Sequence, residues 1–163
     1  LAVADEIDAV LGAERARVKW PNDVWVDGRK IAGILIEASI SGGAVASLVV
    51  GIGVNVHTAA FPDELAPIAT SLAILGAAAR DRAEIAAAIA ARVVEASERF
   101  AERGLVTFGD RLAARDALTG RRVRVDEIEG VARGIDGSGR LVVEAADGRR
   151  VPIVAGHVEL RER

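Results

Sequence analysis

The chain has 163 residues and a mass of 17.0 kDa, enough for one ordinary domain or for a medium domain with a small one. With 51% apolar residues and a net charge of −3, the composition excludes a wholly disordered chain and does not indicate a general nucleic-acid surface. The absence of cysteine excludes disulfides, thiolate metal sites and a cysteine nucleophile, and no apolar run is long enough to span a bilayer.

The first eleven residues are predicted to form a helix, because apolar residues recur at helical spacing and Gly12 is a natural C-terminal stop. Asp5, Glu6 and Asp8 stand where a secretory signal would be positive and then apolar, which favours a cytoplasmic protein. The chain starts inside this helical pattern without a methionine or an N-cap. We therefore expect that sequence is missing upstream.

A group of strands is predicted next. Residues 17–20 alternate between charged and apolar side chains, and residues 24–26 lead into an Asp-Gly pair that supplies the positive φ of a hairpin turn. Two long strand candidates, residues 30–40 and 44–56, are joined by Ser-Gly-Gly. Together these segments predict an antiparallel meander with one covered face.

A loop and two helices are expected after the strands. Residues 57–69 contain two prolines and no clear period, which indicates a loop of functional length. Asp81 followed by Glu84 resembles a capping box, and it predicts a helix that ends at Gly104. A further helix is expected over residues 106–115. The core-facing stripe of the longer helix is predicted to be Ile85, Ile89, Val93, Ala96 and Phe100.

From residue 119 the apolar pattern changes to period two. The predicted strands are residues 121–125, 131–135, 141–143 and 149–154, separated by Glu129 with Gly130, by residues 136–139, and by Asp147 with Gly148. Turn signals about every ten residues indicate a small barrel. We read the turn at residues 136–139 as a simple hairpin connection. The predicted domains are residues 1–116 and 117–163.

The rarest polar and aromatic residue types gather in one region. The only lysines, tryptophans and asparagines are Lys19 and Lys30, Trp20 and Trp25, and Asn22 and Asn55. Lysine approaches a carboxylate or phosphate as a point charge, whereas arginine requires a wider planar fork. Taken singly, a lysine after a turn is usually a surface charge and a tryptophan usually packs in a core. The clustering instead favours chemistry that arginine and alanine do not supply.

Two familiar kinds of site are disfavoured. The Gly-Ile-Gly at residues 51–53 lies inside a strand pattern and is not a phosphate loop, although its glycines would let a ligand approach the backbone closely. His57 and His157 each stand alone without a second ligand at metal spacing. No metal-binding residue is therefore predicted.

Three consecutive segments resemble motifs of biotin protein ligases. They are KWPND at residues 19–23, RKIAGILIE at 29–37 and GIGVNV at 51–56. Residues 69–72 and the small C-terminal barrel are also similar to the family. The resemblance implies an α+β fold, in which a partial mixed or antiparallel sheet with helices, of the class II synthetase-like ligase type, precedes an SH3-like β-barrel. The family's glycine- and arginine-rich biotin loop lies upstream of the opening helix, so the resemblance implies an N-terminally truncated chain.

The resemblance implies that ATP and biotin, with Mg²⁺, form biotinyl-5'-AMP, and that biotin then passes to a lysine of a carboxylase carrier domain. Lys30 would be the cation that stabilises the anionic transition state, with Asn22 and Asp23 beside it. Asn55 would read the adenine edge, and residues 57–69 would close over the adenylate. The implied biotin-binding residues are Gly33, Ile34 and Trp20, with Gly51 and Gly53 in the neighbouring strand.

Two other functions stay open on the sequence. A noncatalytic scaffold could bind a protein partner through the barrel, and a lipoate ligase-like enzyme would use related chemistry with another acyl group. The combination of KWPND with GIGxN favours biotin. Exposed sheet edges would allow a homodimer. Neither a membrane nor a nucleic acid is an expected partner.

Overall fold

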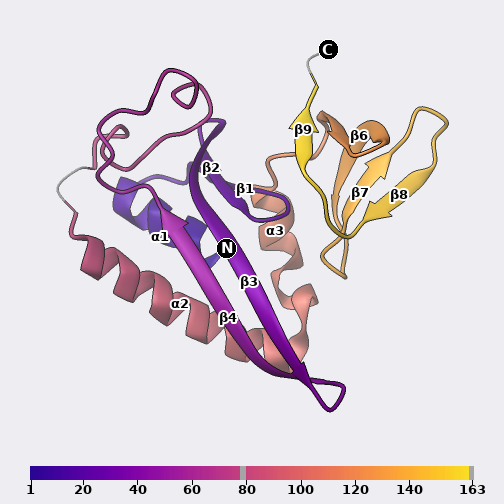
Figure 1. Cartoon of the computed structure of the whole chain (residues 1–163), viewed down its shortest axis with the longest axis horizontal. Helices are drawn as coiled ribbons and strands as arrows, with labels where there is room; N and C mark the ends of the chain where they lie inside the picture. Colours follow the sequence, from indigo (N-terminus) through magenta and orange to yellow (C-terminus); the bar gives the residue numbers. More distant parts are fainter. Residues whose placement is uncertain (78–79, 162–163) are drawn as a thin grey trace.

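The structure is a computed structural model, and it describes residues 1–77 and 80–161. It contains two antiparallel sheets with helices packed beside the first (Figure 1). The first sheet has the strand order β1-β2-β3-β4, and the second has the order β8-β7-β6-β5-β9. The helices are α1 (Ala2–Leu11), α2 (Arg82–Arg103), the 3₁₀ helix η1 (Leu105–Phe108) and α3 (Gly109–Arg115). The strands are β1 (Ala16–Lys19), β2 (Asp23–Val26), β3 (Arg29–Ser41), β4 (Ala44–Val54), β5 (Arg122–Val125), β6 (Ile128–Ile135), β7 (Leu141–Glu144), β8 (Arg150–Ile153) and β9 (Val158–Leu160).

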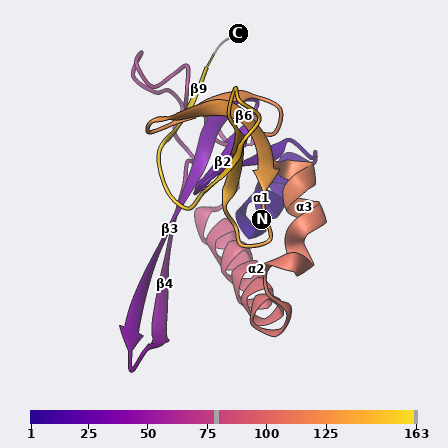
Figure 2. The ribbon, with the colours of Figure 1, turned by 90° about the vertical axis from the view of Figure 1, so that its right-hand side faces the viewer.

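This arrangement confirms the predicted α+β class and the meander with one covered face. Helices α1 and α2 lie on one face of the first sheet (Figures 1 and 2). Alternate residues of the strands point to that face and form the first core with the helices. Its buried members are Val3, Ala4, Ile7, Ala16, Val24, Val26, Ile31, Ala32, Val56, Leu72, Ile85 and Ile89.

The acidic residues of α1 hold the helix against arginines of α2 and α3. Glu6 pairs with Arg92 of α2, with 3.0 Å between Oε2 and Nε. Asp8 is buried, and its Oδ1 accepts hydrogen bonds of 2.8 Å from the main-chain N–H groups of Arg15 and Ala16. Its other oxygen receives Arg115 of α3 at 2.5 Å. Asp8 therefore fixes the start of β1 to both neighbouring helices.

Helix α2 begins where the sequence predicted, because the Asp81 side chain accepts a hydrogen bond of 2.6 Å from the N–H of Ala83. Its predicted apolar stripe is correct only in the first half. Ile85 and Ile89 are buried, whereas Phe100 is 52% exposed because the covered part of the sheet ends before it. The helix expected over residues 106–115 is split into η1 and α3.

The outer half of the β3–β4 hairpin projects away from the helices (Figure 2). Its apolar side chains are exposed on both faces of the ribbon, for example Leu35 at 62%, Ile36 at 60% and Ile40 at 72%. Strand β4 ends at Val54, two residues before the predicted end at 56. No helix in the part of the chain that the structure describes is long and apolar enough to cross a membrane.

The second sheet differs from the prediction in two details. Gly130 does not lie in a turn: it is inside β6, where any side chain would overlap the main-chain carbonyl of Glu144 in β7. The β5–β6 turn is instead formed at Asp126, which has a φ of 52°. Strand β9 was not among the predicted strands, because three residues are too few to display alternation.

The role of Asp8 yields a stability prediction. Replacing Asp8 with alanine should lower the free energy of unfolding by about 3 kcal/mol, because two main-chain donors lose their acceptor and Arg115 loses a partner. Urea unfolding followed by circular dichroism measures the change. The matched control is Asp27→Asn, which removes the charge of an exposed pair with Arg15, suits the positive φ of 50° at this turn, and should cost under about 1 kcal/mol. Equal losses in both variants would contradict the anchoring role.

Candidate functional site

One row of residues crosses the open face of the first sheet. The strand register places Lys19 opposite Asp23, Asp23 opposite Gly33, and Gly33 opposite Gly53. Directly opposed residues point to the same face of a sheet. Val24 and Ala32, one position along, belong to the core beneath. The row therefore lies on the face that the helices leave uncovered.

A bulge brings Lys30 onto the same face as Gly33. Residues three apart in a regular strand point to opposite faces. In β3, however, Trp25 pairs with Lys30 while Val24 pairs with Ala32, so Ile31 is an extra residue. Ile31 and Ala32 are both buried, which restores the alternation one residue late. Lys30 and Gly33 consequently share the open face.

Lys30 and Asp23 form an ion pair with 2.6 Å between Nζ and Oδ1. The Asp23 side chain is only 14% exposed, whereas that of Lys30 is 47% exposed. A Cβ on Gly33 would stand 3.2 Å from the Lys30 Nζ and 3.3 Å from its Cε. Glycine at this position thus lets the lysine side chain lie across the sheet with its ammonium group accessible.

Lys19 adds a second cation that the sequence singled out by rarity but did not place in the site. Its side chain is buried, and its ammonium group lies 5.7 Å from the centre of the Trp25 ring. Burial lowers the pKa of Lys19 below 10.5, its ordinary value, since the charged form loses hydration. The Asp23 carboxylate opposes this shift and the Lys30 ammonium adds to it. The three groups are therefore electrostatically coupled.

Unused hydrogen-bonding capacity is concentrated beside these charges. Trp25 Nε1 and Thr70 Oγ1 are buried without a hydrogen-bond partner, whereas Asp23 Oδ1 faces the Lys30 ammonium at 2.6 Å. Buried polar atoms usually find partners, so this concentration favours a ligand site.

The segment after β4 is tied to Lys30 through the backbone. The Lys30 N–H donates to Ile68 O, and Thr70 N–H donates to Lys30 O, both at 2.8 Å. Asn55 reinforces the contact, because its Nδ2 donates to Thr70 O at 3.0 Å. The amide of Asn55 is thus partly engaged in holding this segment, and its predicted contact with adenine stays a prediction.

Three more of the predicted residues lie on or beside the open face. Gly53 has open space above it on the open face, and Gly51 lies on the same face opposite Leu35. Asn22 is exposed in the β1–β2 turn, and its carbonyl accepts from Ile34 N–H at 2.8 Å. All three positions are compatible with a ligand on the open face.

Two residues predicted to line a biotin pocket lie elsewhere. Ile34 packs against the first core, on the face opposite Lys30, because it is one residue from Gly33 in a regular part of β3. Trp20 is 4% exposed and packs in the core of the second sheet. Neither side chain forms a wall of the Lys30 site in this structure.

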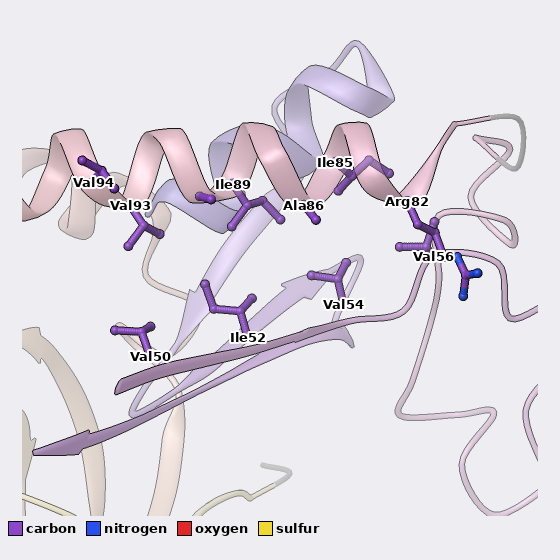
Figure 3. A pocket seen from close by; sticks show the side chains of 11 residues that line it. Val50, Ile52, Val54, Val56, Arg82, Ile85, Ala86, Ile89, Val93 and Val94 are labelled. Carbon is purple, nitrogen blue, oxygen red and sulfur yellow. The ribbon is translucent and has the colours of Figure 1, made fainter. Parts of the chain in front are cut away.

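An apolar cavity of about 530 Å³ lies on the opposite face of the sheet, between β4 and α2 (Figure 3). Ile52 and Val54 of the strand face Ile85 and Ile89 of the helix, and Arg82 lies at one end. The lining offers one cation and no acid or nucleophile. It is therefore less suited to catalysis than the Lys30 site. Among the described residues, no group of three or more histidine or acidic side chains gathers as a metal site.

Comparison with protein families gives two matches in chain order. A model described as "Biotin/lipoate A/B protein ligase family" matches residues 2–55, which include the whole of the Lys19, Asp23 and Lys30 cluster. A model described as "Biotin protein ligase C terminal domain" matches residues 119–161, which contain the second sheet.

Individual relatives agree with these matches. The chain is 33% identical over 163 residues to the bifunctional ligase/repressor BirA of Escherichia coli (strain K12), covering 98% of this chain and 50% of the relative. It is 39% identical over 165 residues to the biotin–[acetyl-CoA-carboxylase] ligase of Mycobacterium tuberculosis, covering 97% of this chain and 59% of the relative. The chain thus spans about half the length of these curated relatives.

A solved structure also matches both sheets together. The biotin protein ligase from Aquifex aeolicus in complex with biotin and ATP superposes with a TM-score of 0.83 at 26% identity. The match covers 99% of this chain and 68% of that chain. The similarity therefore extends to the arrangement of the helices and strands.

The environment of Lys19 leads to a titration prediction. In a chain labelled with ¹³C at lysine Cε, two signals are expected, and substitution of either lysine by arginine assigns them. The Lys19 signal should titrate below 10.5 in the folded chain, its ordinary value in the unfolded one. Between these two pKa values the unfolded chain binds more protons, so the free energy of unfolding should rise with pH. A Lys19 midpoint equal to that in concentrated urea would show that burial does not act on this group.

Proposed function

The chain belongs to the biotin protein ligase family, and from this premise we propose that it carries the adenylate-binding face of an ATP-dependent ligase that attaches biotin to a lysine of a carrier domain. The observation that carries the proposal is the Lys30–Asp23 pair beside Gly33 on an uncovered sheet face. When both ammonium groups of the cluster are protonated, two cations and one carboxylate leave one net positive charge. Such a charge suits a phosphate linked to an acyl group.

The reaction has two steps in this proposal. A carboxylate oxygen of biotin attacks the α-phosphorus of ATP, the bond to the bridging oxygen breaks, and pyrophosphate leaves. The amine of the carrier lysine then attacks the carbonyl carbon of the adenylate, loses a proton, and AMP leaves. Negative charge develops on phosphate oxygens in the first step and on the departing AMP in the second. A fixed cation stabilises both transition states.

Lys30 is the residue best placed to supply that cation. Its backbone is held on one side by Trp25 and on the other by the segment around Ala69, so the base of the side chain is fixed. Asp23 orients the ammonium group, and we propose that it also receives the proton of the carrier lysine. Asn22, exposed one residue earlier, would donate to a phosphate oxygen. Mg²⁺ would accompany the triphosphate, where its charge supplies further neutralisation.

The bare backbone of β3 and β4 supports the placement of a ligand close to the strands. Gly33, Gly51 and Gly53 form a patch without side chains on the open face. Glycines at such positions allow close approach of a ligand to the strand backbone. We propose that biotin lies along this patch and that residues 57–69 cover the adenylate. Protection from water matters because the mixed anhydride hydrolyses readily.

The identity of the carrier and the state of assembly are further proposals. Relatives named biotin–[acetyl-CoA-carboxylase] ligase support a carboxylase carrier domain as the acceptor. The exposed apolar side chains of the β3–β4 hairpin support self-association, as in a homodimer. A location in the cytoplasm would supply ATP and the carrier.

The proposed role of Lys30 is tested by titration calorimetry with a nonhydrolysable biotinyl-adenylate analogue. Lys30→Ala should weaken binding by about 3–4 kcal/mol, two to three orders of magnitude in affinity, because a preorganised donor to the anionic linkage is lost. Arg29→Ala is the matched control, since it removes the adjacent cation without touching Asp23, and it should change affinity by less than about threefold.

Binding that is insensitive to Lys30→Ala, or equally sensitive to Arg29→Ala, would rule out this role for Lys30. A lipoyl-adenylate analogue tested beside the biotinyl one separates the two acyl groups. Tighter binding of the lipoyl compound would indicate that lipoate, and not biotin, is the substrate of the same site.

A further inference from the structure

Trp20 belongs to the second sheet by packing, although it follows β1 of the first sheet in sequence. Its indole is buried with Leu118 and the inward-facing residues of the second core. The indole Nε1 donates a hydrogen bond of 3.0 Å to the main-chain carbonyl of Gly139, across 119 positions of sequence. A buried tryptophan N–H generally requires such a partner. The contact therefore fixes the ring in orientation as well as in depth.

The turn that supplies this carbonyl is internally braced. The Asp136 Oδ1 accepts from the N–H groups of Ser138 and Arg140 at 2.9 and 3.0 Å, and its Oδ2 receives the Arg140 guanidinium at 2.8 Å. These donors, the Arg140 N–H first, hold the pKa of Asp136 below its ordinary value. Gly139 has a φ of 81°, a conformation that favours glycine. The turn is thus a rigid acceptor for Trp20.

The backbone next to Trp20 is attached to the segment that leads from α3 into the second sheet. Val18 forms a parallel bridge with Asp116, and the N–H of Ala117 donates to Val18 O at 2.9 Å. Lys19 consequently lies between two attachment points, one through the backbone of Val18 and one through the indole of Trp20. Its own side chain points to the open face, opposite Asp23.

We propose that Trp20 is a positioning residue for the ligand face: through Gly139 and the second core, it sets where Lys19 and Asp23 stand relative to Lys30. Only Pro21 and Asn22 separate Trp20 from Asp23, and the Lys19–Asp23 pair closes this short turn. A displacement of the indole tilts the turn and moves both charged residues. The second sheet thereby helps to position the charged residues of the site. The catalytic consequence rests on the proposed function, whereas the coupling itself does not.

The coupling is tested without any ligand, by titrating the chain labelled with ¹³C at lysine Cε. Trp20→Phe keeps an aromatic ring in the core and removes the donor to Gly139. In this variant the Lys19 ammonium should become better hydrated, and its titration midpoint should rise by about half a pH unit. The matched control is Val125→Ala, which opens the same core at the opposite end of the sheet, where β5 meets β6.

A second variant tests the coupling between Trp20 and Lys19 if Trp20→Phe does not fold. Asp136→Asn loosens the turn that presents Gly139 and leaves Trp20 in place. It should raise the Lys19 midpoint in the same direction by a smaller amount, and the indole N–H of Trp20 should exchange faster with solvent. An unchanged Lys19 midpoint in a folded variant, or an equal change in Val125→Ala, would overturn the proposal.

The consequence for binding is measured separately. In the same calorimetric assay, Trp20→Phe should weaken the biotinyl-adenylate analogue about tenfold, whereas Val125→Ala should leave its affinity within twofold. Should the unsubstituted chain not bind the analogue, the proposed function fails while the lysine titration still decides the coupling. Should the analogue bind equally well to Trp20→Phe despite a shifted Lys19 midpoint, the positioning role in ligand binding is refuted.

Discussion

The extra residue at Ile31 in β3 determines which side chains share the open face of the first sheet. Without it, Lys30 and Gly33 would point to opposite faces, and the lysine would enter the core against α1 and α2. With it, Ile31 and Ala32 both fill the core while Lys30 reaches across Gly33 to Asp23. The ion pair, the space above Gly33 and the exposure of the ammonium group all depend on this local change of register. A bulge beside a candidate site is consistent with the general use of bulges to redirect side chains.

The site is arranged at a cost in stability that the surrounding contacts offset. Lys19 is a buried cation, and Trp25 Nε1 and Thr70 Oγ1 are buried without a hydrogen-bond partner. Each of these features opposes folding, because groups removed from water lose hydration without full compensation. The first core and the carboxylates of α1, above all Asp8, stabilise the same strands from the other face. Packing on the covered face of the sheet therefore offsets the unfavourable burial of polar groups on the open face.

Much of the fold could be predicted from the sequence because its signals are local. The helix stop at Gly12, the cap at Asp81 and the hairpin turn at Asp27 were recognisable from short segments. The site was recognisable by its rare residue types, and Lys30 and Asp23 are indeed brought together. These features need only neighbouring residues or motif order, which a single sequence contains.

The errors came from features that only tertiary structure determines. Ile34 was assigned to the ligand face because it lies in the motif, but the alternation after the bulge turns it into the core. Gly130 was read as a turn residue, whereas the close approach of two strands requires glycine there. Neither the pairing of β6 with β7 nor the register of β3 is visible in local composition. Such contacts are non-local, and glycine has the same signature in a turn and at a close approach.

Trp20 shows why a motif should be divided residue by residue. In the segment from Lys19 to Asp23, the two charged residues serve the open face of the first sheet, and the tryptophan between them enters the core of the second. One continuous motif therefore contributes side chains to two different sheets. Because a short turn joins them, the two cores cannot shift relative to each other without moving the charged pair. The buried indole and its hydrogen bond to Gly139 make the second sheet a structural determinant of the site, although that sheet contributes none of the charged groups found there.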